Sequence, residues 1–112
     1  MTTEQEIFLA FAITLVTELT LILAIQRPGD WQKWIAGILL INCFTHPIVI
    51  YLLHFQNWPY LLVEAGVILT EAVWYRKFFS ISPRRAMLVS FVANIFSIFM
   101  GMVARKWVEF MT

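Results

Sequence analysis

Residues 7–26 read IFLAFAITLVTELTLILAIQ, an apolar stretch whose single charged residue is Glu18. An α-helix needs about 20 such residues to cross the roughly 30 Å of hydrocarbon in a bilayer. The stretch therefore predicts a membrane-spanning helix. It is preceded by Glu4 and Glu6, whereas a cleaved signal peptide begins with basic residues, so we expect the helix to be retained.

Three more apolar stretches follow, at about 34–54, 60–75 and 86–104. The first and last are long enough to span a bilayer, and the middle one needs the help of its aromatic and basic flanks. We predict an all-α integral membrane four-helix bundle that forms one transmembrane domain over residues 1–112. Pro47 lies inside the second stretch, where we expect a kink that frees a carbonyl about one turn earlier.

The composition agrees with this prediction. The chain is 61% hydrophobic and only 13% charged, against about 25% charged residues in an ordinary soluble domain. A water-soluble protein of this size would have to expose much of that apolar surface, because small domains bury little of their area. The net charge of +1 predicts no nucleic-acid partner. Cys43 is the one cysteine, so no disulfide can form within the chain.

The basic residues indicate the orientation. Two of the three predicted loops hold most of them, and these loops lie on the same side of a four-span arrangement: Arg27 and Lys33 in one, Arg76, Lys77, Arg84 and Arg85 in the other. By the positive-inside rule, loops 27–33 and 76–85 are predicted to be cytoplasmic and both termini extracytoplasmic. The five tryptophans, which are residues 31, 34, 58, 74 and 107, fall at span ends, as in an aromatic belt at the membrane interface.

The two halves of the chain share a faint pattern. Glu18 is followed 24 residues later by Asn42, and Glu71 is followed 23 residues later by Asn94. This spacing is typical of two repeated hairpins, although the rest of the halves aligns poorly and chance remains an alternative. A repeat would relate the two hairpins by an axis along the membrane normal.

Three glutamates lie inside the predicted spans: Glu18, Glu64 and Glu71. A charged residue at the centre of a span costs about 2.5–3.5 kcal/mol or more, so such residues usually face the bundle interior and mark a function. Glu18 and Glu71 are predicted at similar depth. Two carboxylates there would repel each other, so one would be protonated or both would share a cation. Glu64 could instead reach the outer interface, and Glu71 could pair with a basic residue at the inner one.

Polar residues on the neighbouring helices are predicted at nearly the same depth. We expect Glu18, Glu71, His46, Asn42 and Asn94 to bind an ion or a proton, with Thr17, Thr45, Ser97 and Glu64 as the supporting polar shell. Stripes of small polar residues also serve as packing and hydrogen-bonding contacts between membrane helices, which is the alternative for this set. His46 could be a proton relay, a metal ligand or a structural histidine, so the metal question stays open.

Three functions fit this sequence. The first is a small membrane protein that handles a cation or a proton, in the manner of a transporter or channel. The second is a non-catalytic subunit of a larger membrane complex, in contact with partner subunits or pigments; the chain lacks a haem or chlorophyll signature, so no cofactor is predicted. The third is an enzyme with Cys43 and His46 as a nucleophilic pair, although Cys43 is more simply a small buried packing residue. We expect the first function, with the lipid bilayer and a homo-oligomer or partner membrane subunits around the chain.

Overall fold

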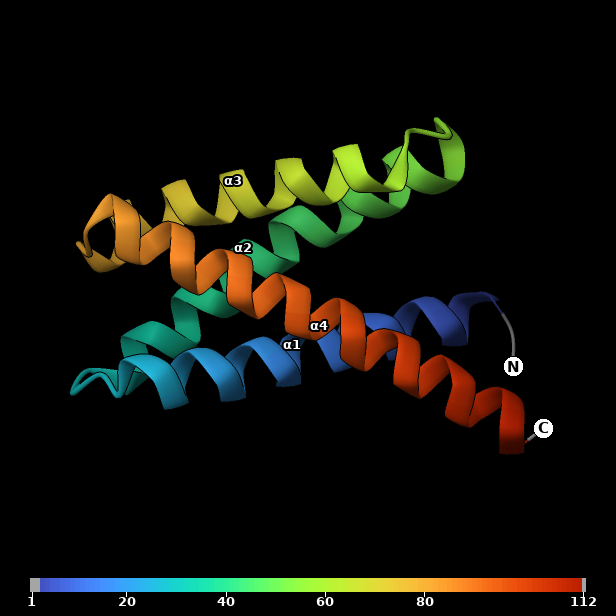
Figure 1. Ribbon diagram of the computed structural model, residues 1–112, viewed down its shortest axis with the longest axis horizontal. Helices are drawn as coiled ribbons and strands as arrows, with labels where there is room; N and C mark the ends of the chain where they lie inside the picture. The colour runs from blue at the N-terminus through green and yellow to red at the C-terminus, as the bar shows by residue number, and fades with distance from the viewer. Residues whose placement is uncertain (1–2, 112) are drawn as a thin grey trace.

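The computed structural model describes residues 3–111, which are almost entirely helical (Figure 1). The helices are α1 (Thr3–Gln26), α2 (Trp31–Ile50), α3 (Tyr60–Phe79) and α4 (Pro83–Met111), and a short π-helical segment, η1 (Tyr51–Phe55), continues α2. No strand occurs within residues 3–111. Each of the four predicted apolar ranges lies inside one of these helical segments.

The helix ends follow from local chemistry. Three non-glycine residues with positive φ interrupt the helical path between successive helices: Arg27, Asn57 and Ser80. At the start of α4 the Ser82 hydroxyl accepts a hydrogen bond from the backbone N–H of Arg85 at 3.1 Å, which is an N-cap interaction just before a proline at the first helical position. Asp30 is the N-cap residue of α2, but its side chain makes no capping hydrogen bond.

Pro47 lies inside α2, as the sequence requires, and the helical path continues past it. Four residues later the chain changes to the π-helical turn of η1. A proline removes one backbone donor and crowds the preceding turn, so the hydrogen-bond register is easily changed nearby. Single π-helical turns of this kind are common at functional sites, and this turn forms part of the cavity wall described below.

The helices form a bundle in which α2 and α4 cross as an X in Figure 1. Helix α1 packs against α2 and α4, and α3 also packs against α2 and α4, so α1 and α3 are diagonal partners. The α1–α2 and α3–α4 loops lie together at one end, which we call the basic end (Figure 1). The two chain ends and the η1–α3 loop lie at the opposite end, which we call the terminal end.

Much of the outer surface is apolar. Large side chains are widely exposed, among them Phe8 at 72%, Leu61 at 81% and Phe110 at 83%. Soluble monomers rarely expose apolar surface on this scale. Three helices, α1, α2 with η1, and α4, are long and apolar enough to cross a membrane. Helix α3 has 20 residues but carries four charged ones, so it does not meet the same criterion.

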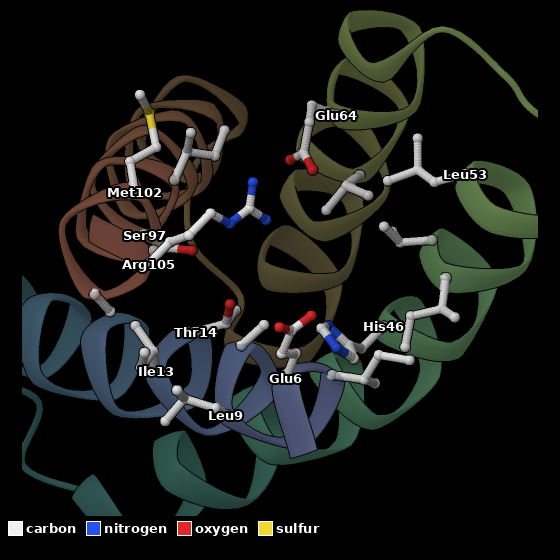
Figure 2. A pocket seen from close by; sticks show the side chains of 18 of the residues that line it. Glu6, Leu9, Ile13, Thr14, His46, Leu53, Glu64, Ser97, Met102 and Arg105 are labelled. Atoms are coloured by element: carbon white, nitrogen blue, oxygen red, sulfur yellow. The ribbon is translucent and has the colours of Figure 1, made fainter. Parts of the chain in front are cut away.

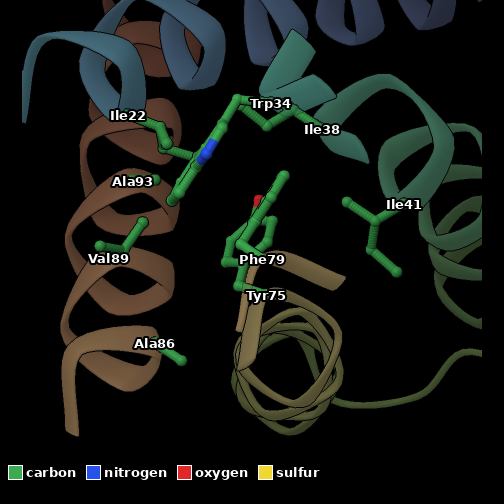
Figure 3. Packing of buried hydrophobic residues seen from close by; sticks show 9 residues of the cluster. All are labelled: Ile22, Trp34, Ile38, Ile41, Tyr75, Phe79, Ala86, Val89 and Ala93. Atoms are coloured by element: carbon green, nitrogen blue, oxygen red, sulfur yellow. The ribbon is translucent and has the colours of Figure 1, made fainter. Parts of the chain in front are cut away.

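The apolar core fills the half of the bundle nearer the basic end (Figure 3). The Trp34 indole of α2 stacks on the Phe79 ring of α3, with ring centroids 3.8 Å apart and planes 3° apart. Tyr75 lies in the same cluster and is fully buried, and smaller residues of α4 complete it: Ala86, Val89 and Ala93. Trp34 therefore differs from the prediction of an interfacial tryptophan, because it turns inward and is only 5% exposed.

Close packing at Gly37 gives a first prediction. A Cβ at this position would lie 2.6 Å from a ring carbon of Phe79 and 2.7 Å from one of Phe78. We expect Gly37→Ala to lower the free energy of unfolding by about 1–3 kcal/mol, because both rings must leave their positions in the core. Thermal unfolding in detergent measures this change.

Gly66 supplies the control, because a Cβ there would meet nothing within 4 Å. Gly66→Ala is expected to preserve or slightly raise the stability, since alanine favours a helix over glycine by up to about 1 kcal/mol. Equal effects of the two substitutions would contradict the packing described for Gly37.

Candidate functional site

Two glutamates meet at the centre of the bundle. Glu18 comes from α1 and Glu71 from α3, the two diagonal helices, and both side chains are buried, with exposed fractions of 0% and 1%. Their carboxyl groups interact directly with each other. The apolar stretches bring them to one depth, because Glu18 is eight residues from the end of α1 and Glu71 is eight residues from the end of α3.

Glu71 is well provided with hydrogen-bond donors. The Asn94 side-chain amide of α4 donates to its Oε1 at 2.7 Å. The Thr45 hydroxyl of α2 donates to its Oε2 at 3.3 Å. Both donors are buried. Hydrogen bonds to a charged acceptor are stronger than neutral ones, so these two side chains can hold a carboxylate at this position.

Glu18 has a different environment. Neither of its carboxyl oxygens accepts a hydrogen bond from any group in residues 3–111. Its neighbours are the Glu71 carboxyl and the Asn42 side chain, and the Asn42 amide is directed to the backbone carbonyl of Ile38 at 2.9 Å. A buried polar group without a partner is costly. The carboxyl pair is therefore short of one donor, and a single proton on either carboxyl would supply it.

The two asparagines occupy related positions. Each side-chain amide donates to the carbonyl four residues earlier in its own helix, Asn42 to Ile38 at 2.9 Å and Asn94 to Ser90 at 2.8 Å. Each also lies beside the glutamate of the preceding helix. The two arrangements differ in one respect: the Asn94 amide also donates to Glu71, whereas within residues 3–111 no group donates to Glu18.

A cavity of about 600 Å³ leads to this pair from the terminal end. Its walls come from α1, the second half of α2 with η1, α3 and α4 (Figure 2). Glu71, Thr45, Asn42, Asn94 and Ser97 line the deep end, which we call the cavity floor. Glu18 does not line the cavity. It lies behind Glu71, and the apolar core closes the bundle beyond the pair.

Other residues of the predicted site lie apart from the carboxyl pair. His46 is on the cavity wall, where its ring contacts the Phe11 ring with centroids 4.6 Å apart and planes tilted by 33°. Its Nε2 atom has no hydrogen-bond partner within residues 3–111. Glu64 also lines the cavity, and in Figure 2 it reaches inward opposite Arg105 of α4. Thr17 is half-buried on α1 and lies outside the cavity lining.

The structure separates Cys43 from His46. Cys43 is exposed on the outside of α2, whereas His46 faces the cavity. The expectation of a buried packing cysteine was therefore wrong, because position 43 falls on the surface of α2 that no other helix covers. Within residues 3–111, no group of three histidine, cysteine, aspartate or glutamate side chains is placed to hold a metal ion.

Sequence reasoning missed two residues, Tyr75 and Arg105. The Tyr75 hydroxyl is buried, has no hydrogen-bond partner in the part of the chain that the structure describes, and lies close to both Glu18 and Glu71. Its position four residues after Glu71 was the available signal, since residues four apart share a helix face. Arg105 lies near the end of the last apolar stretch, and no pattern in the sequence marks it, yet it reaches into the cavity mouth (Figure 2).

The unpartnered Tyr75 hydroxyl gives a second prediction. We expect Tyr75→Phe to leave the free energy of unfolding unchanged or to raise it by up to about 1 kcal/mol, because the ring stays and only an unsatisfied polar atom is removed. Thermal unfolding in detergent is the measurement, with Tyr75→Leu as a control that also removes ring packing. A loss of stability in Tyr75→Phe would show that the hydroxyl has a partner after all.

Comparison with protein-family models, with curated proteins and with solved structures gave no match for this chain.

Proposed function

We propose that the chain is a four-span membrane bundle in which α3 crosses together with the three longer apolar helices. The four charged residues of α3 have suitable places for this: Glu71 is buried inside the bundle, Glu64 lines the cavity, and Arg76 and Lys77 lie in the last turn at the basic end. The longest dimension of the molecule is 42 Å, close to the roughly 40–45 Å thickness of a bilayer with its headgroups. By the positive-inside rule the basic end would be cytoplasmic.

We further propose that this bundle binds one proton between Glu18 and Glu71 and carries it across the membrane. One observation carries the proposal: a fully buried glutamate with no donor faces a second buried glutamate at the end of a cavity. A structural contact between helices needs no carboxyl group. Two carboxyl groups that share one proton satisfy each other, whereas two carboxylates would repel at close range in a medium of low dielectric constant.

The residues around the carboxyl pair support a defined path for the proton. A proton arriving through the cavity first meets Glu71, because Glu71 lines the floor and Glu18 does not. Transfer from the Glu71 carboxyl to the Glu18 carboxylate moves one proton and leaves Glu71 charged, with Thr45 and Asn94 as donors. The stack of Trp34 on Phe79 closes the other side. Release toward the basic end then requires this seal to open while the cavity closes.

Proton uptake into proteoliposomes tests the proposal. Purified protein is reconstituted with a pH-sensitive dye inside the vesicles, and a potassium gradient with valinomycin drives the uptake. We expect wild type to acidify the interior, and Glu18→Gln and Glu71→Gln to reduce the rate to that of empty vesicles. Glu4→Gln is the matched control, because Glu4 is exposed in the first turn of α1 and lies outside the cavity lining.

A carrier for another cation and an accessory subunit would each give a different result. A channel or carrier for sodium or potassium would move that ion without acidification and would still depend on Glu18 and Glu71. An accessory subunit would show no flux when isolated and would copurify with partner membrane proteins. Wild-type uptake that persists in both glutamine variants would overturn the role of the carboxyl pair.

A further inference from the structure

The cavity is larger than a proton path requires. Its volume of about 600 Å³ lies within the range of about 300–1,000 Å³ that is usual for small-molecule sites. Between floor and mouth its walls are mainly aliphatic, with Ile13 of α1, Val49 and Leu53 of α2 and η1, Val67 of α3 and Ile98 of α4. Such walls favour an organic body over a chain of water molecules, because apolar surface gains by leaving water.

The charged residues that line the cavity determine whether it binds a cation or an anion. Glu71 is the acidic group on the floor, and Thr45, Asn94 and Ser97 around it are neutral. Among the described lining residues, Glu6 and Glu64 lie nearer the mouth together with one guanidinium, that of Arg105. A cavity with an excess of carboxylates attracts cations and repels anions.

We propose that the cavity binds a small organic monocation, with its apolar body against the aliphatic walls and its charged group at the Glu71 carboxylate. The inference rests on the proposed function, because it gives the proton-binding carboxyl pair a second ligand. The buried Glu18 carboxyl is independent evidence that Glu71 does more than pack between helices. This carboxyl, which has no hydrogen-bond partner within residues 3–111, shares the single proton of the pair with Glu71, and the positive charge of the bound cation drives that proton off to water.

The titratable groups around Glu71 limit where this proton can go. Glu18 faces it from α1 and His46 lies on the α2 wall, while Glu64 and Tyr75 belong to α3 itself. Helix α4 presents the neutral Asn94 and Ser97 at the floor and Arg105 at the mouth. Within residues 3–111, Glu18 accepts no hydrogen bond from another group, so the shared proton is held by the carboxyl pair alone. Binding of the cation places a second positive charge beside this proton, and the repulsion should release the proton to water.

Isothermal titration of the full-length protein in detergent tests the assignment. The probe is benzyltrimethylammonium, whose charge is permanent, and neopentylbenzene is its neutral counterpart of the same shape. We expect the cation to bind wild type and the neutral molecule to bind at least about tenfold more weakly, because only the cation gains from the carboxylate. Titrations in two buffers with different ionisation enthalpies should reveal release of a proton on binding.

Variants decide which residues are responsible. Glu71→Gln should weaken cation binding by at least about tenfold and abolish the proton release, since a neutral amide holds no counter-charge. Glu4→Gln should change neither quantity. Thermal unfolding of each variant verifies that it is folded. Absence of cation binding, equal binding of the neutral molecule, or binding that survives in Glu71→Gln would each overturn the assignment.

The outcomes also separate this assignment from the proposed function. Proton uptake by wild type without cation binding would overturn the organic-cation site and leave the proton carrier standing. Cation binding through Glu71 without proton uptake would support the site and overturn the proton carrier.

Discussion

Glu18→Leu is expected to stop proton uptake and at the same time to make the protein more stable. Leucine is apolar and of roughly similar volume, and within residues 3–111 no backbone or neutral side-chain donor serves Glu18. The proton that Glu18 shares with Glu71 can remain on Glu71 when Glu18 is replaced. A buried polar group without a hydrogen-bond partner costs about 1–3 kcal/mol, so its replacement by an apolar residue should stabilise the fold by a similar amount. Two measurements on the same protein preparation test this prediction. Thermal unfolding in detergent gives the stability, and proton uptake in proteoliposomes gives the transport activity.

Glu71→Leu is the matched control, because the same chemical change meets a different environment. It removes the acceptor of Thr45 and of Asn94. The buried Thr45 hydroxyl then loses its partner, which costs about 1–3 kcal/mol. We therefore expect both leucine variants to lose proton uptake but to change stability in opposite directions. Marked destabilisation by Glu18→Leu would mean that this carboxyl has a native partner, such as a bound ion, and uptake that persists would exclude Glu18 from the path.

The sequence predicts where the helices run and which residues share a depth. Long apolar stretches and helix-breaking prolines define the helices, and three of these helices meet the length and hydropathy of membrane spans. The depth of Glu18 and Glu71 follows from counting residues to the nearest basic loop, at 1.5 Å per residue. Their approach across the bundle follows because the lipid side offers a carboxyl group no partner.

The sequence could not predict which side chains donate hydrogen bonds to each of the two carboxyl groups. Periodicity places Asn42 and Asn94 at matching depths, but only the rotation and crossing of the helices decide that Asn94 and Thr45 reach Glu71 while Glu18 receives no donor. The same limit applies to Trp34. Its place near a span end predicts an interfacial residue, yet it packs against Phe79 in the core.

Trp34→Ala is expected to weaken the fold and to open the bundle toward the basic end. Trp34 is 5% exposed and covers the face of Phe79, so alanine leaves a void in the densest part of the apolar core. Large-to-small changes of buried tryptophan cost about 3–5 kcal/mol. The void lies in the seal between the carboxyl pair and the basic end, so water can approach Glu18 from that side. If Trp34→Ala stays folded, protons should leak across the protein without the alternate opening of the cavity and of the basic end.

Thermal unfolding and passive proton leak in proteoliposomes measure this prediction, and Trp31→Ala is its control. Trp31 is one turn earlier on the same helix but is 53% exposed, so its truncation removes surface contacts alone and should change stability by no more than about 0.5 kcal/mol. If Trp34→Ala destabilises the protein and the leak stays at the wild-type level, the barrier lies elsewhere, and the rings of Tyr75 and Phe78 become the next positions to truncate. If the two alanine variants are equally stable, the stack on Phe79 does not hold the basic end of the bundle together.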